Sequence, residues 1–514
     1  MTATDLPVTH PAPDDLPDLA AFGQGLRPYA GWARTTPHLM ATDPLGRKVR
    51  RSLEEAIEAS GLRDGMTISF HHHFREGDKS INLVVDTIAR MGLRDLTLAS
   101  SSLNRCHAPL VRHVQDGVIT RIYTSGMRGE LARRISGGLL EHPVMIHSHG
   151  GRAALVTSGE LHLDVAFLGV SACDAMGNAN GVTGRSHCGS LGYAMVDAEH
   201  ADKVVMLTEE IVPYPNTPVS ISQDRVDHVV VVDEVGDPSK ISVGAARLTK
   251  DPKELLIARL AADVIEHSGC FEDGFSMQTG SGASATAVTQ FLGPRMRHQG
   301  ISAGWALGGI TGGMVDLHRQ GLVRRILDVQ DFDTVAAQSL AENPDHREIS
   351  ANEYANPFSK GACSDGLDVV ILSALEIDLD FDVNVITGSD GLMMGASGGH
   401  CDVAAGANLA VVVAPLIRSR IPVVVDKVTT RVTPGETIGV LVTDHGIAVN
   451  PARPDVEERL RAAGLPVTTI HQLYERAVSI TGVPRPIERG DQVVGVVRYR
   501  DGSVIDVVRQ VLAP

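Results

Sequence analysis

Residues 66–100 read MTISFHHHFREGDKSINLVVDTIARMGLRDLTLAS, and this stretch predicts the fold. MTISF is a short apolar run typical of a buried strand, INLVVDTIARMG has the apolar spacing of a helix, and DLTLAS is again strand-like. A strand, a helix and a second strand in this order form the βαβ unit of a parallel sheet. The same alternation continues to the run VDHVVVVDEV near residue 235, so we expect an α/β domain here.

The flanking segments predict further elements and a second domain. Before this unit, RKVRRSLEEAIEASG (47–61) places Val49, Leu53, Ile57 and Ser60 on one helical face and ends at Gly61. A second cycle starts near residue 251 with the helical KELLIARLAADVIEHSG, which leads into FSMQTGSGASATAV. The later runs LDVVILSALEIDLD, ANLAVVVAPL, RIPVVVDKVTT and TIGVLVTDHGIAV are typical of strands buried on both faces, and PDVEERLRAAG and TIHQLYERAVSITG predict closing helices.

We therefore predict an α/β fold of two tandem open-sheet domains with helices on both faces, and a cleft between them. Residues 1–45 are rich in Pro, Asp and Thr without a period and are predicted to form an N-terminal arm. Residues 46–245 are assigned to the first domain and residues 246–514 to the second. The 52 glycines suit many tight strand-to-helix turns, as in an anion-binding enzyme with several loops.

Composition excludes several function classes. The net charge of −16 argues against a nucleic-acid partner, because counterion release needs a surplus of Lys and Arg. The six cysteines form no CxxC pair, which favours reduced thiols over a disulfide framework or a zinc site. Neither a signal peptide nor an apolar run of membrane-spanning length is present, so we expect a soluble cytoplasmic protein without membrane contact.

The most informative segment is SALEIDLDFDVNVITGSDGLMMGASGGHCDVA, residues 373–404. Glu376 follows a predicted buried strand directly, at the edge where open α/β sheets bind ligands. A carboxylate there can attack a thioester carbonyl and give an enzyme-bound anhydride. The alternative is that Glu376 and Asp378 cap a turn.

Two glycine-rich loops are predicted to bind anions through backbone N–H groups. The first contains Gly388, Ser389, Asp390, Gly391, Gly398 and Gly399 and suits an oxyanion or a substrate carboxylate; Asp390 is either a second active-site carboxylate or a turn former. The second contains Gln278, Gly280, Ser281, Gly282 and Ala283, and suits a phosphate at a helix N-terminus. It lacks the GK[ST] of a P-loop, and an ordinary tight turn is the alternative.

The segment SFHHHFREGDKS (69–80) is the candidate substrate-binding loop. If it continues the strand, His71 and His73 share a face and His72 points away, and without a third spaced ligand we expect no metal site. With Arg75 and Lys79, these two histidines can bind a multiply charged carboxylate. Arg105, Arg128 and Arg185 lie in similar glycine- or serine-rich turns and are expected to be solvated or structural.

Taken together, these segments resemble the family I CoA-transferases, and more closely their citrate lyase alpha branch, from about residue 46 onward. That family's catalytic glutamate lies in an A-[LI]-E-[VFI]-D-[IL] segment, and ALEIDL puts Glu376 on it. FSMQTGSGASATAV is similar to the family's LQLGIGGIPNAV, GGMVDL to its DGVMDL and LVTDHGIA to its VTEYGIA, whereas VSACDAMGNANG departs from its SPPDKHGYCSLG. DGMTISFHHHFREGD, GSDGLMMGASGGHCD and PVSISQDRVDHVV are similar to the citrate lyase alpha branch.

The resemblance implies an exchange of the acetyl group of an acyl carrier protein, or of CoA, for citrate. It implies two partner chains, a beta chain that cleaves citryl thioester and a small gamma chain carrying a CoA-like prosthetic group, in a homo- and hetero-oligomer. No cofactor is expected in this chain itself. Either Glu376 attacks the thioester, which we favour, or a citrate carboxylate attacks and Glu376 assists; the resemblance fits both.

Two rival functions remain open. A generic CoA-transferase or thioester hydrolase for another acid uses the same glutamate, but the cationic HHHFREGD loop suits a tricarboxylate better than acetate. A non-catalytic scaffold with this fold is disfavoured by the intact ALEIDL segment and glycine loops. The choice between citrate and citramalate does not follow from the sequence.

Overall fold

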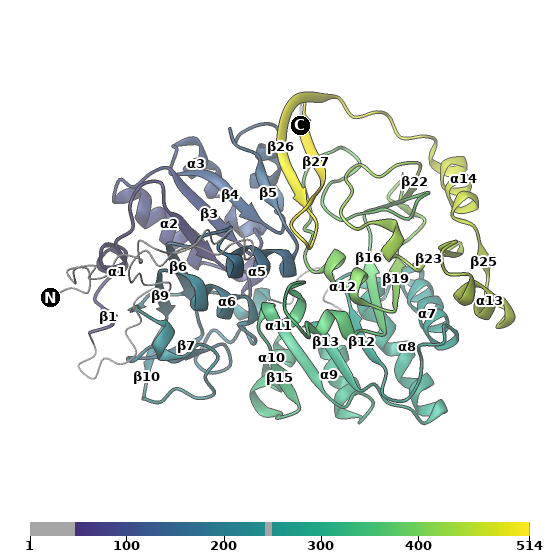
Figure 1. Ribbon diagram of the computed structural model, residues 1–514, viewed down its shortest axis with the longest axis horizontal. Coiled ribbons are helices and arrows are strands. Elements are labelled where there is room, and N and C mark those ends of the chain that lie inside the picture. Colours follow the sequence, from purple (N-terminus) through teal and green to yellow (C-terminus); the bar gives the residue numbers. More distant parts are fainter. Residues whose placement is uncertain (1–46, 242–248, 513–514) are drawn as a thin grey trace, which may run out of the picture. The chain divides into compact units, whose positions relative to one another are not determined.

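The computed structural model describes residues 47–241 and 249–512, which belong to one compact unit (Figure 1). The arm predicted at residues 1–45 and the predicted domain boundary at residues 245 and 246 lie outside the described residues. Two large, mainly parallel sheets connected by helices dominate the described part, so the prediction of a mixed α/β fold is confirmed. None of the described helices has the length and apolarity to cross a bilayer.

The first sheet has ten strands in the order β1-β11-β9-β6-β2-β3-β4-β5-β26-β27. Its strands are β1 (Val49–Arg50), β2 (Thr67–Phe70), β3 (Leu96–Ser100), β4 (Ile119–Thr124), β5 (Val144–Ile146), β6 (Val165–Gly169), β9 (Lys203–Thr208), β11 (His228–Val231), β26 (Arg489–Arg498) and β27 (Val504–Val511). The helices between them are α1 (Leu53–Ser60), α2 (Ser80–Arg90), α3 (Leu110–Gln115), α4 (Gly129–Ser136), α5 (His149–Ser158) and α6 (Gly192–His200).

Helix α1 shows how local signals set the element boundaries. The Ser52 hydroxyl accepts a hydrogen bond from the Glu55 N–H and starts the helix, and Gly61 ends it with a φ of 73°. The predicted end is therefore correct. The predicted start was too early, because Val49 lies in β1 and pairs with β11 of the same sheet.

The C-terminal hairpin β26–β27 crosses the predicted domain assignment. We had assigned residues 246–514 to the second domain, yet β26 pairs with β5, with Gly495 opposite Val144, and extends the first sheet. In Figure 1 this yellow hairpin lies beside β5. We had not predicted the two strands, although the alternating QVVGVVRYR and SVIDVVRQV flank an Asp-Gly pair, a sequence signal of hairpins.

The second sheet has nine strands in the order β15-β14-β13-β12-β16-β19-β23-β24-β25. Its strands are β12 (Ser276–Thr279), β13 (Trp305–Ile310), β14 (Ile326–Asp331), β15 (His346–Glu348), β16 (Val369–Ser373), β19 (Leu409–Val413), β23 (Val440–Thr443), β24 (Gly446–Val449) and β25 (Val467–Thr468). The helices of this half are α7 (Pro252–His267), α8 (Ala283–Gln299), α9 (Gly312–Arg319), α10 (Thr334–Glu342), α11 (Ala351–Ala355), α12 (His400–Gly406), α13 (Pro454–Ala462) and α14 (Ile470–Thr481).

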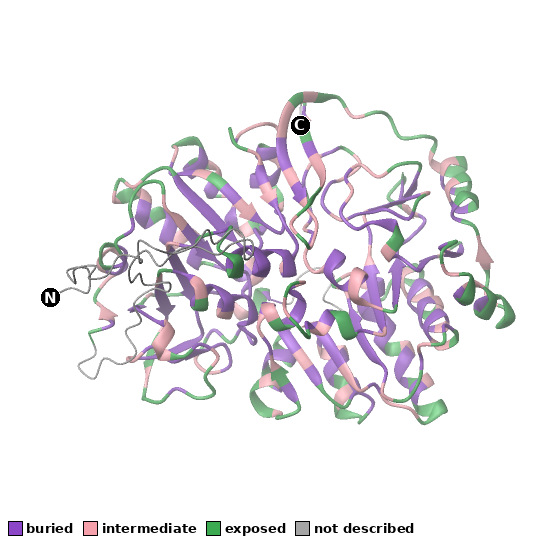
Figure 2. Cartoon of the chain, in the orientation of Figure 1, coloured by how far each residue is buried: buried purple, intermediate pink, exposed green. Residues whose placement is uncertain are grey.

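The two faces of the second sheet belong to different hydrophobic clusters, since successive side chains of a strand point to opposite faces. On β16, Val369 and Ile371 pack into a cluster confined to the second half, which includes Ile257 of α7. Val370 and Leu372 pack instead into a cluster that also contains Phe70 of the first sheet. Buried residues accordingly follow the strands of both sheets, as Figure 2 shows.

Each half also carries a small three-stranded sheet of the same design. In the first half β7 (Ala172–Asp174) pairs with β8 (Ala179–Asn180) in antiparallel and with β10 (Ile211–Val212) in parallel fashion. In the second half β17 (Glu376–Asp378) pairs in the same way with β18 (Val383–Asn384) and β22 (Val424–Val425). Ala172 opposite Asn180 thus corresponds to Glu376 opposite Asn384.

The remaining short elements are the hairpin strands β20 (Ile417–Arg418) and β21 (Ile421–Pro422) and the 3-10 helices Arg75–Gly77, Arg105–His107, Gln223–Arg225, Pro238–Lys240, Cys363–Gly366 and Gly435–Thr437. All six cysteines are unpaired, as predicted.

Candidate active site

A cavity of about 650 Å³ lies where loops of both halves meet. Its walls are built largely by loops that follow β2, β3, β4 and β5 of the first sheet and β12, β14 and β16 of the second. The carboxyl ends of parallel strands are where open α/β sheets bind ligands. The residues discussed below that line it are His72, Arg75, Glu76, Asn104, Arg105, Arg128, His149, Tyr193, Gln278, Gly280, Ser281, Gly282, Phe332, Tyr354, Ala374, Leu375, Gly395, Gly398, Gly399 and Arg418.

The charged side chains of the lining are mostly cationic: four arginines face one glutamate, Glu76. The Arg75 guanidinium lies 4.6 Å above the ring centre of Phe332, and its Nη1 has no hydrogen-bond partner among the described residues. Burial, and after it the nearby charge of Arg128, lowers the pKa of Arg75 to about 10, so it stays cationic at neutral pH. Such a concave surface with surplus positive charge suits a multiply charged anion.

Buried polar atoms without a hydrogen-bond partner also indicate that the cavity binds a polar ligand. Among the described residues, Asn104 Nδ2, His149 Nδ1 and Gln278 Oε1 are buried and have no hydrogen-bond partner. Buried polar atoms of native proteins are nearly always hydrogen-bonded, so a cavity with several such atoms is prepared for a polar ligand.

Of the three consecutive histidines, the structure brings His72 and not the predicted pair to the cavity. His72 Nδ1 lies 2.6 Å from Ser101 Oγ, and the His72 ring stacks on His149 and on Tyr193, with centroids 5.3 and 5.2 Å apart. Burial, followed by the charge of His149, lowers the pKa of His72 well below its usual value, so this imidazole is neutral near pH 7.

His71, His73 and Lys79 lie elsewhere. The Nδ1 atoms of His71 and His73 contact each other, and His73 Nε2 lies 2.8 Å from the Gly169 carbonyl. Lys79 is exposed and pairs with Glu234. The prediction that these three side chains join Arg75 in a substrate loop is therefore not supported by the lining, because the chain leaves β2 at Phe70 and the strand alternation used for the prediction stops there.

The prediction for the other arginines was also incomplete. Arg128 lines the cavity, half-buried, with Nη1 3.5 Å from Asn104 Oδ1, and Arg105 also borders it. Arg185 is exposed and pairs with Glu209, as expected of a solvated arginine. All three lie in similar glycine- or serine-rich turns, so only the fold distinguishes them.

Of the predicted glycine loop 388–399, only the later part lines the cavity. Gly398 and Gly399 line the cavity, and the Gly398 carbonyl accepts a hydrogen bond of 2.8 Å from the N–H of His149. A Cβ on Gly126 would lie 2.3 Å from the Gly395 carbonyl oxygen, so glycine is required where the two loops touch.

The earlier part of this loop forms a separate turn outside the lining. The Gly391 N–H donates to the Gly388 carbonyl, and Asp390 is exposed and accepts a hydrogen bond of 3.1 Å from the Leu392 N–H. Of the two interpretations of Asp390, this geometry fits the turn former. Gly388, Ser389 and Gly391 lie in the same turn.

The other predicted loop, residues 278–283, lines the cavity with all of its predicted residues except Ala283. Gln278, Gly280, Ser281 and Gly282 line it, and Gly282 is the N-cap of α8, which begins at Ala283. Gln278 Nε2 donates to the Tyr354 hydroxyl at 3.1 Å. The loop presents the N-terminus of α8, a favourable end for a phosphate.

Glu376 is buried next to the cavity and is not part of its lining. Its Oε2 accepts hydrogen bonds from Asn384 Nδ2 (2.9 Å) and the Thr429 N–H (2.7 Å), and its Oε1 accepts one from Thr429 Oγ1 (3.0 Å). Ala374 and Leu375, immediately before it, do line the cavity. In this arrangement the carboxylate ties the Thr429 segment to β17 and steadies the adjacent wall.

The small sheet occurs in both halves, so its residues in the second half can be compared with their counterparts in the first. Asp378 accepts hydrogen bonds from three backbone N–H groups, of Asp380, Asp382 and Val428. Asp174, its counterpart in the first half, likewise accepts from several backbone N–H groups. Asp378 therefore fits the turn-capping interpretation, whereas Glu376 has Ala172 as its counterpart and is particular to the second half.

Comparison with known proteins agrees with this geometry. The model of the family "citrate lyase, alpha subunit" matches residues 46–511. The chain is 63% identical over 488 residues to a citrate lyase alpha chain of Klebsiella pneumoniae, covering 95% of this chain and 96% of that one, and 65% identical over 465 residues to one of Escherichia coli K12, covering 90% and 91%. It is similar to a solved structure, with citrate, of an alpha subunit of citrate lyase from Streptococcus mutans, with a TM-score of 0.91, 52% identity and coverage of 95% and 96%.

Proposed function

Because the chain belongs to the citrate lyase alpha subunit family, we propose that it transfers the carrier thiol of an acetyl thioester to citrate. The reaction gives citryl thioester and acetate. The observation that carries the proposal is the cavity with four arginines, one glutamate and several unpartnered buried polar atoms. A tricarboxylate matches that charge, and the Streptococcus mutans relative is a complex with citrate.

Arg75 and Arg128 are proposed to bind citrate carboxylates through charge-assisted hydrogen bonds. His72 and His149 supply hydrogen bonds without added charge; burial lowers the pKa of both, and that of His149 to about 3. A reaction that exchanges carboxylates moves no net proton, so neutral imidazoles suit it.

The direct route fits the position of Glu376 best. A citrate carboxylate oxygen attacks the acetyl thioester carbonyl, the thiolate leaves, and a mixed anhydride forms. The thiolate then attacks the citryl carbonyl of the anhydride, and acetate leaves. The N–H groups of Gly398 and Gly399 are proposed to stabilise the oxyanions, and Glu376 acts as a positioning residue because its oxygens are bonded to Asn384 and Thr429.

The prosthetic arm of a carrier partner is proposed to enter along Gln278, Gly280, Ser281 and Gly282, with the N-terminus of α8 facing its phosphate. The CoA-like group belongs to that partner, a gamma chain, and a beta chain cleaves the citryl thioester in a cytoplasmic hetero-oligomer. The two sheets are proposed to represent two tandem CoA-transferase-like domains, with the C-terminal hairpin returning to the first.

The test is acetate release from acetyl-CoA or acetyl-carrier with citrate, citramalate or acetate as acceptor. Arg75→Ala is compared with Lys79→Ala, which removes a surface cation paired with Glu234. Loss of one charge-assisted hydrogen bond costs about 1.5–3 kcal/mol, so the citrate KM of Arg75→Ala rises by about 10-fold or more. The KM of Lys79→Ala stays unchanged.

A wild-type protein that uses acetate and never citrate contradicts the proposal. It would favour the second candidate, a CoA-transferase or thioester hydrolase for another acid.

A further inference from the structure

A buried cluster of acidic groups and one histidine lies behind the cavity wall. Asp328 and Asp331 lie on β14 and His346 on the neighbouring strand β15. The two aspartates are 0% exposed and His346 is 3% exposed. One carboxylate oxygen of each aspartate and a ring nitrogen of His346 lie within 4.8 Å of one another.

In each aspartate, one carboxylate oxygen accepts a hydrogen bond from a backbone N–H and the other does not. Asp328 Oδ1 accepts a hydrogen bond from the Gln330 N–H (2.7 Å), while Oδ2 lies 3.1 Å from His346 Nε2. Asp331 Oδ2 accepts one from the Ser190 N–H (2.8 Å), while its buried Oδ1 accepts none from an N–H or hydroxyl group of the described residues. This division, with one oxygen fixed by the backbone, is common among carboxylates whose other oxygen binds a metal.

Among the described residues, His346 is the one basic side chain that forms an ion pair with these aspartates, and its partner is Asp328. The other charged groups that act on Asp328 are acidic, namely Glu348 and Asp333. Buried carboxylates persist only when paired, protonated or bound to a metal.

We infer that Asp328, Asp331 and His346 bind one divalent transition-metal cation of the zinc or manganese class. Two carboxylates and one imidazole suit these ions. Ligand bonds of about 2.1 Å place neighbouring ligand atoms roughly 3 Å apart, as are Asp328 Oδ2 and His346 Nε2. His346 Nδ1 lies 3.0 Å from Ser339 Oγ, the orienting contact usual for a metal-bound imidazole. The sequence analysis predicts no metal site, because these ligands are spread over two strands.

The ion would fasten the first half of the chain to the second. Besides the contact from the Ser190 N–H, Ser190 Oγ donates to the Asp328 carbonyl at 3.0 Å. A Cβ on Gly189 would lie 1.5 Å from Asp331 Oδ2, so this loop presses directly on the carboxylate. The loop continues into α6, whose Tyr193 lines the cavity. The role is structural: the ion holds the loop that places Tyr193.

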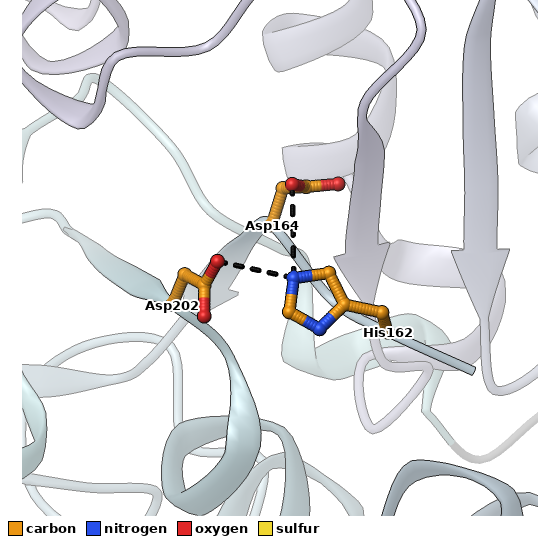
Figure 3. Close-up of side chains that lie close together, drawn as sticks. All are labelled: His162, Asp164 and Asp202. Carbon is orange, nitrogen blue, oxygen red and sulfur yellow. Dashed lines mark hydrogen bonds and ion pairs between the residues drawn. The ribbon is translucent and has the colours of Figure 1, made fainter. Parts of the chain in front are cut away.

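A second cluster on the surface provides a matched control (Figure 3). His162 Nε2 lies 3.0 Å from Asp202 and 3.8 Å from Asp164, and the His162 side chain is 57% exposed. Water hydrates these groups, and the second oxygen of Asp164 is bonded to the Thr67 N–H. This arrangement is stable without an ion.

The experiment uses the full chain, unfolded in guanidinium with chelator and refolded with Zn²⁺ or Mn²⁺, because a buried site fills during folding. Bound metal is then measured by mass spectrometry after desalting. Wild type and Asp202→Asn are expected to retain about one ion per chain, and Asp331→Asn and His346→Gln to lose it. Wild type as purified is measured directly, so the result does not depend on the variants folding.

Two outcomes overturn the inference. If wild type retains neither Zn²⁺ nor Mn²⁺, the aspartates share a proton in place of an ion. If the ion is lost in Asp202→Asn and kept in Asp331→Asn, the metal binds at the surface cluster.

Discussion

Substitution of Glu376 can show whether this residue acts as a nucleophile or positions the cavity wall. In Glu376→Gln the amide oxygen can replace Oε2 as acceptor for Asn384 Nδ2 and the Thr429 N–H, and the amide nitrogen can donate to Thr429 Oγ1. The geometry is kept and the charge is lost, which costs about 1 kcal/mol of unfolding free energy. A carboxamide cannot form the anhydride, so a nucleophilic role would lower kcat by a factor of about 10³ or more.

Glu376→Ala gives the complementary measurement. Asn384 Nδ2 keeps its bonds to Thr387, whereas the Thr429 N–H loses its acceptor and β17 loses its tie to this segment. We expect about 2–4 kcal/mol of destabilisation from the lost charge-assisted bonds and the small cavity. The Thr429 segment then loosens, and kcat falls mainly through disorder of the wall formed by Ala374 and Leu375.

The assay combines initial rates of citrate-dependent acetate release with urea unfolding. A positioning role predicts that Glu376→Gln keeps kcat within about tenfold of wild type, while Glu376→Ala loses both stability and rate. The reasoning is refuted if Glu376→Gln unfolds like wild type and yet is inactive, particularly if wild type gains the mass of a covalent adduct on incubation with acetyl-CoA alone.

Two further predictions concern Asp402 and Gly399. Burial raises the pKa of Asp402 to about 6 from its ordinary 3.8, so the folded state binds the Asp402 proton more tightly than the unfolded state does. The unfolding free energy therefore falls by about 3 kcal/mol as the pH rises from below the unfolded-state pKa to above the folded-state pKa. Between pH 4 and 7, which span most of this range, the unfolding free energy measured in urea should fall by about 2 kcal/mol less in Asp402→Asn than in wild type. An equal fall in both proteins would contradict a raised pKa of Asp402. A Cβ on Gly399 would lie 2.2 Å from the Tyr354 hydroxyl, which holds Gln278, whereas one on Gly398 meets nothing closer than 3.7 Å. Gly399→Ala should therefore reduce acetate release more than tenfold, and Gly398→Ala, with only the strain of its φ of 55°, far less; equal effects would argue against the packing explanation.

Much of the fold and part of the site followed from sequence. Apolar runs with a period of two or 3.6 predicted most strands and helices, because burial of one face dictates that spacing. Glycines marked the loops that build the cavity, at Gly280, Gly282, Gly398 and Gly399. At two of them there is no room for a Cβ, which would lie 1.8 Å from Ser373 Oγ on Gly282 and 2.2 Å from the Tyr354 hydroxyl on Gly399. Arg75 was placed among the substrate-binding candidates for its charge alone.

What the tertiary structure decided were the surroundings of each polar side chain. His71, His72 and His73 are identical in type, and only the path of the chain after β2 brings His72 to the cavity. Glu376 stands in a family motif, yet its oxygens are bonded to Thr429, 53 residues away. Asp331 gained a partner in Ser190, 141 residues earlier, and the hairpin β26–β27 returned to the first sheet. Sequence spacing encodes contacts within an element, whereas these contacts join residues that only folding brings together.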